Sequence, residues 1–107
     1  MTEQQRKALH LYFRWLAEAL REKDFDFRDL TVEIPATEYM VKELMFKPII
    51  YSMYGKNSTM KLENNEVSQA YDVLHRALIE KLDVNVPFPD EEDLARDEAD
   101  RKFYGEK

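Results

Sequence analysis

Basic side chains recur at helical spacing on the polar side of the first long stretch of the sequence. Arg6, His10 and Arg14 lie four residues apart, so in a helix they form one row along its surface. Such a row can contact a phosphate backbone, because basic side chains neutralise phosphates. The alternative is an ordinary solvated face, in which Arg14 forms an ion pair with Glu18 that stabilises the helix by about 0.2–0.5 kcal/mol. The spacing fits both interpretations.

A second group of polar and basic residues lies between Gly55 and Glu63. Lys56 and Lys61 enclose a short polar run that includes Ser58 and Thr59. Backbone amides and hydroxyls in a loop of this kind can hold a phosphate. The same residue types also favour plain turns, so a simple connection between helices is the alternative.

The sequence shows no set of residues that would converge for catalysis. His10 and His75 belong to different predicted helices, and the chain has two glycines and no cysteine. Nucleotide-binding loops need more glycine, and the known nucleophile and zinc motifs are missing. We therefore expect no catalytic residues, no metal site and no cofactor, and an enzyme is the least favoured class.

The composition predicts one folded and soluble domain in a chain of 107 residues, 44% of them hydrophobic and 36% charged. The net charge of −6 argues against a strongly basic nucleic-acid binder. This charge is uneven, because residues 90–107 hold eight acids and four bases. No apolar run approaches the roughly 20 residues that span a bilayer, and no signal-peptide pattern is seen. We expect a cytoplasmic protein of a host cell, without membrane contact.

The longest uninterrupted helical pattern covers residues 2–20 and carries the basic row. Thr2 and Gln5 fit a capping box at its start. Apolar residues form two adjacent rows along this stretch, around the single tryptophan, Trp15. A face of that width predicts contact with two partner elements. It also predicts self-association, as a symmetric helical homodimer.

Two further helices are predicted downstream. One runs from Thr37 to about Tyr54, with a kink or break just before Pro48 and a stop at Gly55. The other covers residues 64–82, with Asn64 or Asn65 as its cap.

The remaining segments are short and extended, or acidic. LTVEIP at 30–35 reads as a strand or link, and VNVPFP at 84–89 is extended because of its prolines. They either pair as a two-strand element or lie across the helices. The expected fold is therefore mainly α: a three-helix or four-helix domain over residues 1–89 with at most a small two-strand element. Residues 90–107 form an acidic C-terminal segment, as a short helix or a tail.

Three stretches carry a resemblance to a known group of proteins: QQRKALHLYFRWLAEAL, ATEYMVKELMFKPII and NSTMKLENNEVSQAYDVLHRALIEKLDVNVPFP. In this order they resemble small uncharacterised phage proteins encoded among replication and recombination genes. More distantly they are similar to the NinB family of phage recombination proteins, which bind single-stranded DNA. The shared pattern is a Gln-rich start before an aromatic helix, a second helix, and a Ser-Thr turn before a last long helix.

The resemblance spans roughly residues 3–89 and implies DNA contact. It places Gln5, Arg6, Lys56, Ser58 and Thr59 at the matching positions. The chain departs from the family because it lacks the strand-rich N-terminal portion and is acidic at its C-terminus.

Two hypotheses of function follow. The first is an accessory protein of phage recombination or replication that binds single-stranded nucleic acid without catalysis. Its phosphate contacts would be Arg6, Arg14, Lys56 and Lys61, with bases stacked on Trp15, Tyr51 or Tyr54. The second is an acidic phage inhibitor of a host nucleic-acid enzyme, like an anti-CRISPR or DNA-mimic protein, in which residues 90–107 imitate phosphates. The partner is thus single-stranded DNA in one case and a host or phage protein in the other.

Overall fold

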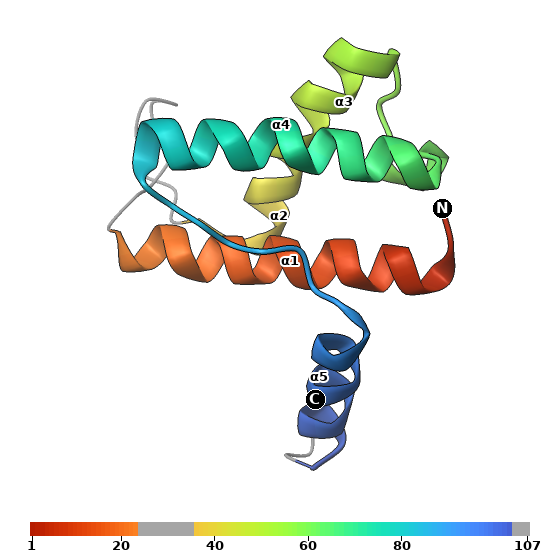
Figure 1. The fold of residues 1–107 in the computed structure, drawn as a ribbon, viewed down its shortest axis with the longest axis vertical. Helices are drawn as coiled ribbons and strands as arrows, with labels where there is room; N and C mark the ends of the chain where they lie inside the picture. The colour runs from red at the N-terminus through yellow and green to blue at the C-terminus, as the bar shows by residue number, and fades with distance from the viewer. Residues whose placement is uncertain (24–35, 104–107) are drawn as a thin grey trace.

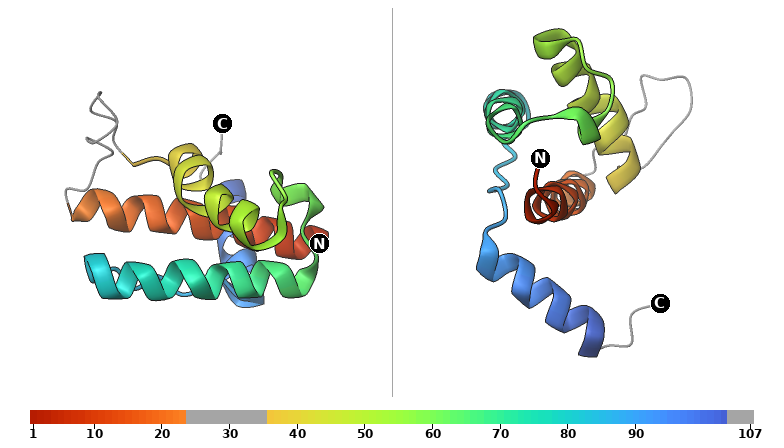
Figure 2. Two further views of the ribbon diagram at one scale, coloured as in Figure 1. Left: turned by 90° about the horizontal axis from the view of Figure 1, so that it is seen from above. Right: turned by 90° about the vertical axis from the view of Figure 1, so that its right-hand side faces the viewer.

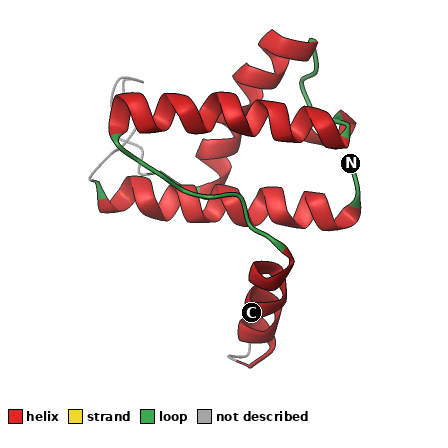
Figure 3. Cartoon of the chain, viewed as in Figure 1, coloured by secondary structure: helices red, strands yellow, loops and turns green. Residues whose placement is uncertain are grey.

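The computed structural model describes residues 1–23 and 36–103, and these residues are mainly helical (Figure 1). The elements in chain order are α1 (Glu3–Glu22), α2 (Glu38–Val41), the π-helical turn η2 (Lys42–Phe46), α3 (Lys47–Tyr54), the 3-10 turn η3 (Thr59–Lys61), α4 (Asn64–Leu82) and α5 (Glu91–Phe103). No strand occurs in the described residues (Figure 3). The predicted mainly helical fold is confirmed, whereas the strand predicted at 30–35 falls outside the described residues.

Helices α1 and α4 lie side by side and run in the same direction (Figure 1). At the N-terminal ends of the two helices, the backbone amide of Thr2 donates to the side-chain oxygen of Asn64 at 3.3 Å. At their far ends, the Lys23 ammonium lies 3.6 Å from the Asp83 carboxylate. The continuous helical segment α2–η2–α3 crosses this pair on one side, as the views in Figure 2 show.

The wide apolar face of α1 forms the centre of the core. Its largest side chains are fully buried: Leu9, Tyr12, Phe13, Leu16 and Leu20. The Tyr12 ring lies 5.0 Å from that of Tyr71 on α4 and 6.0 Å from that of Phe88 in the segment before α5, measured between centroids. The Phe13 ring lies 5.1 Å from that of Phe46 in η2. This face is therefore covered within one chain, and the homodimer stays a prediction.

The start of α1 confirms half of the predicted capping box. The Thr2 hydroxyl accepts a hydrogen bond from the Gln5 amide at 3.0 Å. The Gln5 side chain does not reach back to Thr2 and donates instead to the Asn64 carbonyl at 3.2 Å. A tertiary contact has replaced the second local hydrogen bond.

The second predicted helix is present, with an irregular turn close to Pro48. Thr37 caps it, because its hydroxyl accepts from the Met40 amide at 3.2 Å. Proline lacks an N–H and clashes with the carbonyl four residues earlier, which here belongs to Leu44 inside η2. The wider π-turn accommodates this clash without ending the helix. Gly55 ends α3 with φ of 68°, as predicted.

The cap of α4 differs from the prediction. Glu63, not Asn64 or Asn65, is the N-cap, and it forms a capping box with Glu66. The Glu66 carboxylate accepts from the Glu63 amide at 3.0 Å. Asn64 is already inside the helix and uses its side chain to bind the start of α1. The prediction placed the cap one or two residues too late, because asparagine is a preferred N-cap residue and glutamate is not.

The segment after α4 crosses the helix pair as an extended link and leads into α5 (Figure 1). Val84 and Val86 are buried, while Asn85 and Pro87 between and after them are exposed. The Tyr71 hydroxyl donates to the Val86 carbonyl at 2.9 Å. Of the two alternatives for this segment, the described residues show the one in which it lies across the helices.

The acidic C-terminal segment is a helix as far as Phe103. The Asp90 carboxylate accepts from the Asp93 amide at 2.8 Å, and the Asp93 carboxylate accepts from the Asp90 amide at 3.0 Å. The backbone hydrogen bond from Asp90, together with Arg96, lowers the pKa of Asp93. The predicted boundary between residues 89 and 90 therefore falls one residue before α5.

Candidate nucleic-acid interface

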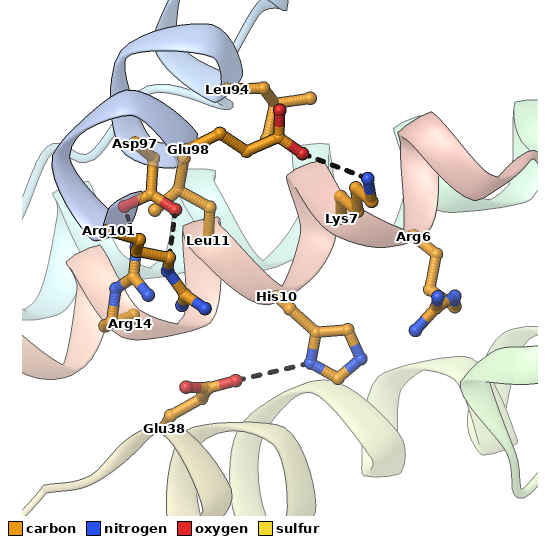
Figure 4. Close-up of a pocket in the computed structure, with 10 residues that line it drawn as sticks. All are labelled: Arg6, Lys7, His10, Leu11, Arg14, Glu38, Leu94, Asp97, Glu98 and Arg101. Carbon is orange, nitrogen blue, oxygen red and sulfur yellow. Dashed lines mark hydrogen bonds and ion pairs between the residues drawn. The ribbon is translucent and has the colours of Figure 1, made fainter. Parts of the chain in front are cut away.

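Helix α1 directs most of its basic side chains into one groove. Arg6, His10 and Arg14 follow one another at intervals of four residues, and Lys7 lies beside them. The groove holds about 230 Å³ and is bordered by α1, α5 and the start of α2. Its lining consists of Arg6, Lys7, His10, Leu11, Arg14, Glu38, Leu94, Asp97, Glu98 and Arg101 (Figure 4). Two of the predicted residues, Arg6 and Arg14, are thus brought together.

Carboxylates from α5 contact the cations of this groove. An Asp97 oxygen lies 2.5 Å from the Arg14 guanidinium, and its other oxygen lies 3.2 Å from the Arg101 guanidinium. The Lys7 ammonium lies 3.1 Å from the Glu98 carboxylate (Figure 4). The predicted pairing of Arg14 with Glu18 was therefore wrong. Arg14 faces α5 and finds a carboxylate there, distant in the chain but directly opposite in space.

The other two basic residues of the row have their own acidic neighbours. His10 Nδ1 lies 3.3 Å from the Glu38 carboxylate at the start of α2. The Arg6 guanidinium donates a hydrogen bond to the Glu3 carboxylate at 2.6 Å, one turn earlier on α1. This hydrogen bond lowers the pKa of Glu3. Each cation of the row therefore has an acidic contact, and these side chains are partly or largely exposed to solvent.

A second hollow adjoins the groove at His10 and Glu38. It is lined by His10, Thr37, Glu38, Tyr39 and Lys42. The Tyr39 side chain is exposed over 63% of its surface. An exposed aromatic ring and a further cation therefore lie next to the basic row.

The predicted residues of the 56–61 loop form a separate group before α4. The Lys56 ammonium lies 2.7 Å from the Glu66 carboxylate and donates to the Lys61 carbonyl at 3.1 Å. The hydrogen bond from Lys56 lowers the pKa of Glu66. Ser58 caps η3, since its hydroxyl accepts from the Met60 amide at 3.2 Å.

Two other predicted residues have structural contacts, and one remains exposed. Thr59 is buried, with 6% of its surface exposed. Gln5 faces the start of α4, to which it donates a hydrogen bond. Lys61 is exposed. A role of this loop in DNA binding stays a prediction, and any phosphate that contacts Lys56 must compete with Glu66.

The residues of the groove were visible in the sequence only in part. The spacing of Arg6, His10 and Arg14 showed the row, but nothing local indicated that Asp97 and Glu98 would lie opposite. One feature of the sequence could have indicated the second wall of the groove. Leu94, Asp97, Glu98 and Arg101 are spaced three and four residues apart, so they share one face of α5.

Two further features are absent from the described residues. Within residues 1–23 and 36–103, no three His, Cys, Asp or Glu side chains gather so that they could hold a metal ion. None of the helices described here is long and apolar enough to cross a membrane.

Comparison with known proteins does not assign the chain to a group. No protein family, no curated protein and no solved structure matches it. The resemblance to small phage proteins and to the NinB family therefore remains a hypothesis, and any function must be argued from the residues themselves.

Proposed function

We propose that this protein binds single-stranded nucleic acid without catalysis, as an accessory protein of phage recombination or replication, and that the groove along α1 is its binding surface. The observation that carries this proposal is the convergence of Arg6, Lys7, His10 and Arg14 on one groove. A line of cations that follows a helix can track a phosphate backbone, and release of counterions then drives association. The sequence resemblance supports the same class of function.

The hollow beside the row supplies a surface for a base. Binding of single strands without sequence preference combines a cationic groove with exposed aromatic rings, each stacked base being worth about 1–3 kcal/mol. Tyr39 meets this requirement, because its ring is largely exposed and adjoins His10. Of the three aromatic residues proposed from the sequence, Trp15 packs partly against the core, and the Tyr54 hydroxyl donates to Gln69 at 2.6 Å. Tyr51 is exposed on α3.

The test is a titration of a short fluorescein-labelled oligo(dT) with the full chain, followed by anisotropy at several salt concentrations. The variant Arg6→Gln/Arg14→Gln removes two groove cations. The matched control, Arg76→Gln/Lys81→Gln, removes two exposed cations from α4 and changes the net charge equally. We expect the groove variant to lower the slope of log K against log salt by about 1.4, since each phosphate contact with a single strand contributes about 0.7.

A third variant, Tyr39→Ala, addresses stacking. We expect roughly a tenfold loss of affinity with an unchanged salt slope, because the ring carries no charge. The proposal is rejected if the wild-type chain fails to bind at low salt, or if the groove variant and the α4 control bind equally well.

A second candidate function is favoured by one observation. Residues 91–103 form a helix, so the acidic groups of α5 have a regular spacing along one element, as imitation of phosphates requires. The exposed acids are Asp90, Glu91, Glu92, Glu98 and Asp100. In this alternative, α5 enters the nucleic-acid site of a host enzyme as an acidic inhibitor. The test is inhibition of nucleases and CRISPR effectors by the full chain, which the variant Glu92→Gln/Asp100→Asn should weaken.

A further inference from the structure

The carboxylates of α5 occupy the groove as an oxyanion ligand would. Asp97 lies between the Arg14 and Arg101 guanidinium groups, with one oxygen directed to each. Glu98 takes the Lys7 ammonium in the same way. Carboxylate and phosphate oxygens use the same charge-assisted hydrogen bonds to such groups, so one can replace the other.

We propose that α5 is an intramolecular competitor that covers the groove, with Asp97 and Glu98 at the positions where phosphates of single-stranded nucleic acid would contact Arg14 and Lys7. Binding then requires α5 to move away from α1. This inference rests on the proposed function and adds a regulatory element to the same site.

The spacing of the two cations fits a run of phosphates. Lys7 and Arg14 are seven residues apart and therefore lie on one side of α1, about 10 Å apart along its axis. Arg6 and His10 lie close to them and line the same groove. Once α5 has left, one side of the helix presents four basic groups in succession.

The attachment of α5 is suited to displacement. From Glu91 to Lys102 no side chain is buried, and only Asp93, Leu94 and Asp97 are half-buried. Exposed ion pairs contribute little to stability, and a segment with few buried apolar contacts opens readily. Figure 2 shows α5 against α1 on the side away from α4 and otherwise projecting from the helices.

The link to the core would remain in place during this movement. Val84 and Val86 are buried in front of α5, and the Val86 carbonyl accepts the Tyr71 hydroxyl. Displacement of α5 therefore needs a change of backbone conformation only after the buried residues of the link. Helix α5 is a tethered cover whose acids are held at a high local concentration next to the cations.

The experiment compares full-length variants in the oligo(dT) titration, with helix content checked by circular dichroism. Asp97→Asn/Glu98→Gln removes the two acids that contact the groove. The control Glu92→Gln/Asp100→Asn removes two exposed acids of the same helix that do not line the groove, with the same change in net charge. A separate variant, Leu94→Ala, weakens the apolar contact of α5 without changing any charge.

We expect the groove-facing variant to bind about fivefold more tightly than the control. Its salt slope should equal that of the control, because the same cations contact phosphates in every complex once α5 has moved away. Leu94→Ala should also bind more tightly than the wild type.

The alternative outcomes separate the two proposals. If all variants bind oligo(dT) with equal affinity, the groove function stands and the competitor role of α5 is wrong. If the groove-facing variant binds more tightly than the wild type but no better than its control, the gain in affinity comes from the lower negative charge alone. The competitor role of α5 is then also rejected. If neither the wild type nor any variant binds, both the proposed function and the competitor role are rejected.

Discussion

Replacement of Tyr12 by Phe should stabilise the protein. The Tyr12 side chain is fully buried, and its hydroxyl has no hydrogen-bond partner among the described residues. A buried polar group without a partner costs about 1–3 kcal/mol relative to a satisfied one. Phe keeps the ring and its contacts with Tyr71 and Phe88. We expect a gain of about 1 kcal/mol, which raises the melting temperature by about 4–8 °C in a domain of this size.

The same replacement at Tyr71 should lower the stability of the protein. Its hydroxyl donates to the Val86 carbonyl at 2.9 Å, so Tyr71→Phe removes a hydrogen bond and leaves that carbonyl without its donor. The expected loss is about 0.5–1.5 kcal/mol. Because both variants delete one phenol oxygen next to the same rings, the comparison isolates the effect of the hydrogen bond.

Urea unfolding, followed by far-ultraviolet circular dichroism and by Trp15 emission, measures both effects. The slope m should be unchanged in the two variants, so that the shift in midpoint reports stability alone. Coincidence of the two signals tests whether unfolding is a single transition.

The pH dependence provides a second readout of Tyr12. Burial, with a smaller effect from Tyr71, raises the pKa of Tyr12 well above its usual range. The unfolded chain releases this proton near pH 10, whereas the folded chain retains it. Alkali therefore favours unfolding, and the stability is lost as the pH rises above about 10. Tyr12→Phe should unfold less readily in alkali than the wild type.

A clear result would refute this reasoning. If Tyr12→Phe lowers the midpoint as much as Tyr71→Phe does, the Tyr12 hydroxyl has a partner in solution and the assumed cost does not exist. An unchanged alkaline profile would refute the claim that Tyr12 stays protonated in the fold.

Two further predictions concern local contacts. The hydrogen bond from Lys56 holds the pKa of Glu66 below its usual value, so this contribution to stability is present above about pH 4.3 and is lost as the pH falls through the lowered pKa. Glu66→Gln should therefore make acid unfolding, followed by circular dichroism, less steep in that range. Gly55 has φ of 68°, and a Cβ added there would meet no atom within 4 Å, so Gly55→Ala carries only the backbone cost. We expect a loss of about 1 kcal/mol in thermal unfolding, and a smaller loss for Gly55→Asn.

Short-range interactions made much of the fold predictable. Thr37 and its helix, the irregular turn before Pro48 and the stop at Gly55 depend on backbone chemistry within a few residues. The apolar rows of α1 likewise showed that more than one element would cover it. These features follow from the sequence because each interaction involves residues that are neighbours in the chain.

Tertiary structure decided which polar groups meet. The cap of α4 is Glu63, and the predicted Asn64 instead accepts a hydrogen bond from the Thr2 amide at the start of α1. Arg14 pairs with Asp97, which is 83 positions away in the chain, and not with Glu18 one turn along its own helix. A periodic pattern gives the face on which a charge lies, but it does not give the element that will face it. That choice depended on how the link at 84–89 crosses α1 and α4, because its buried valines fix the side of α1 on which α5 emerges.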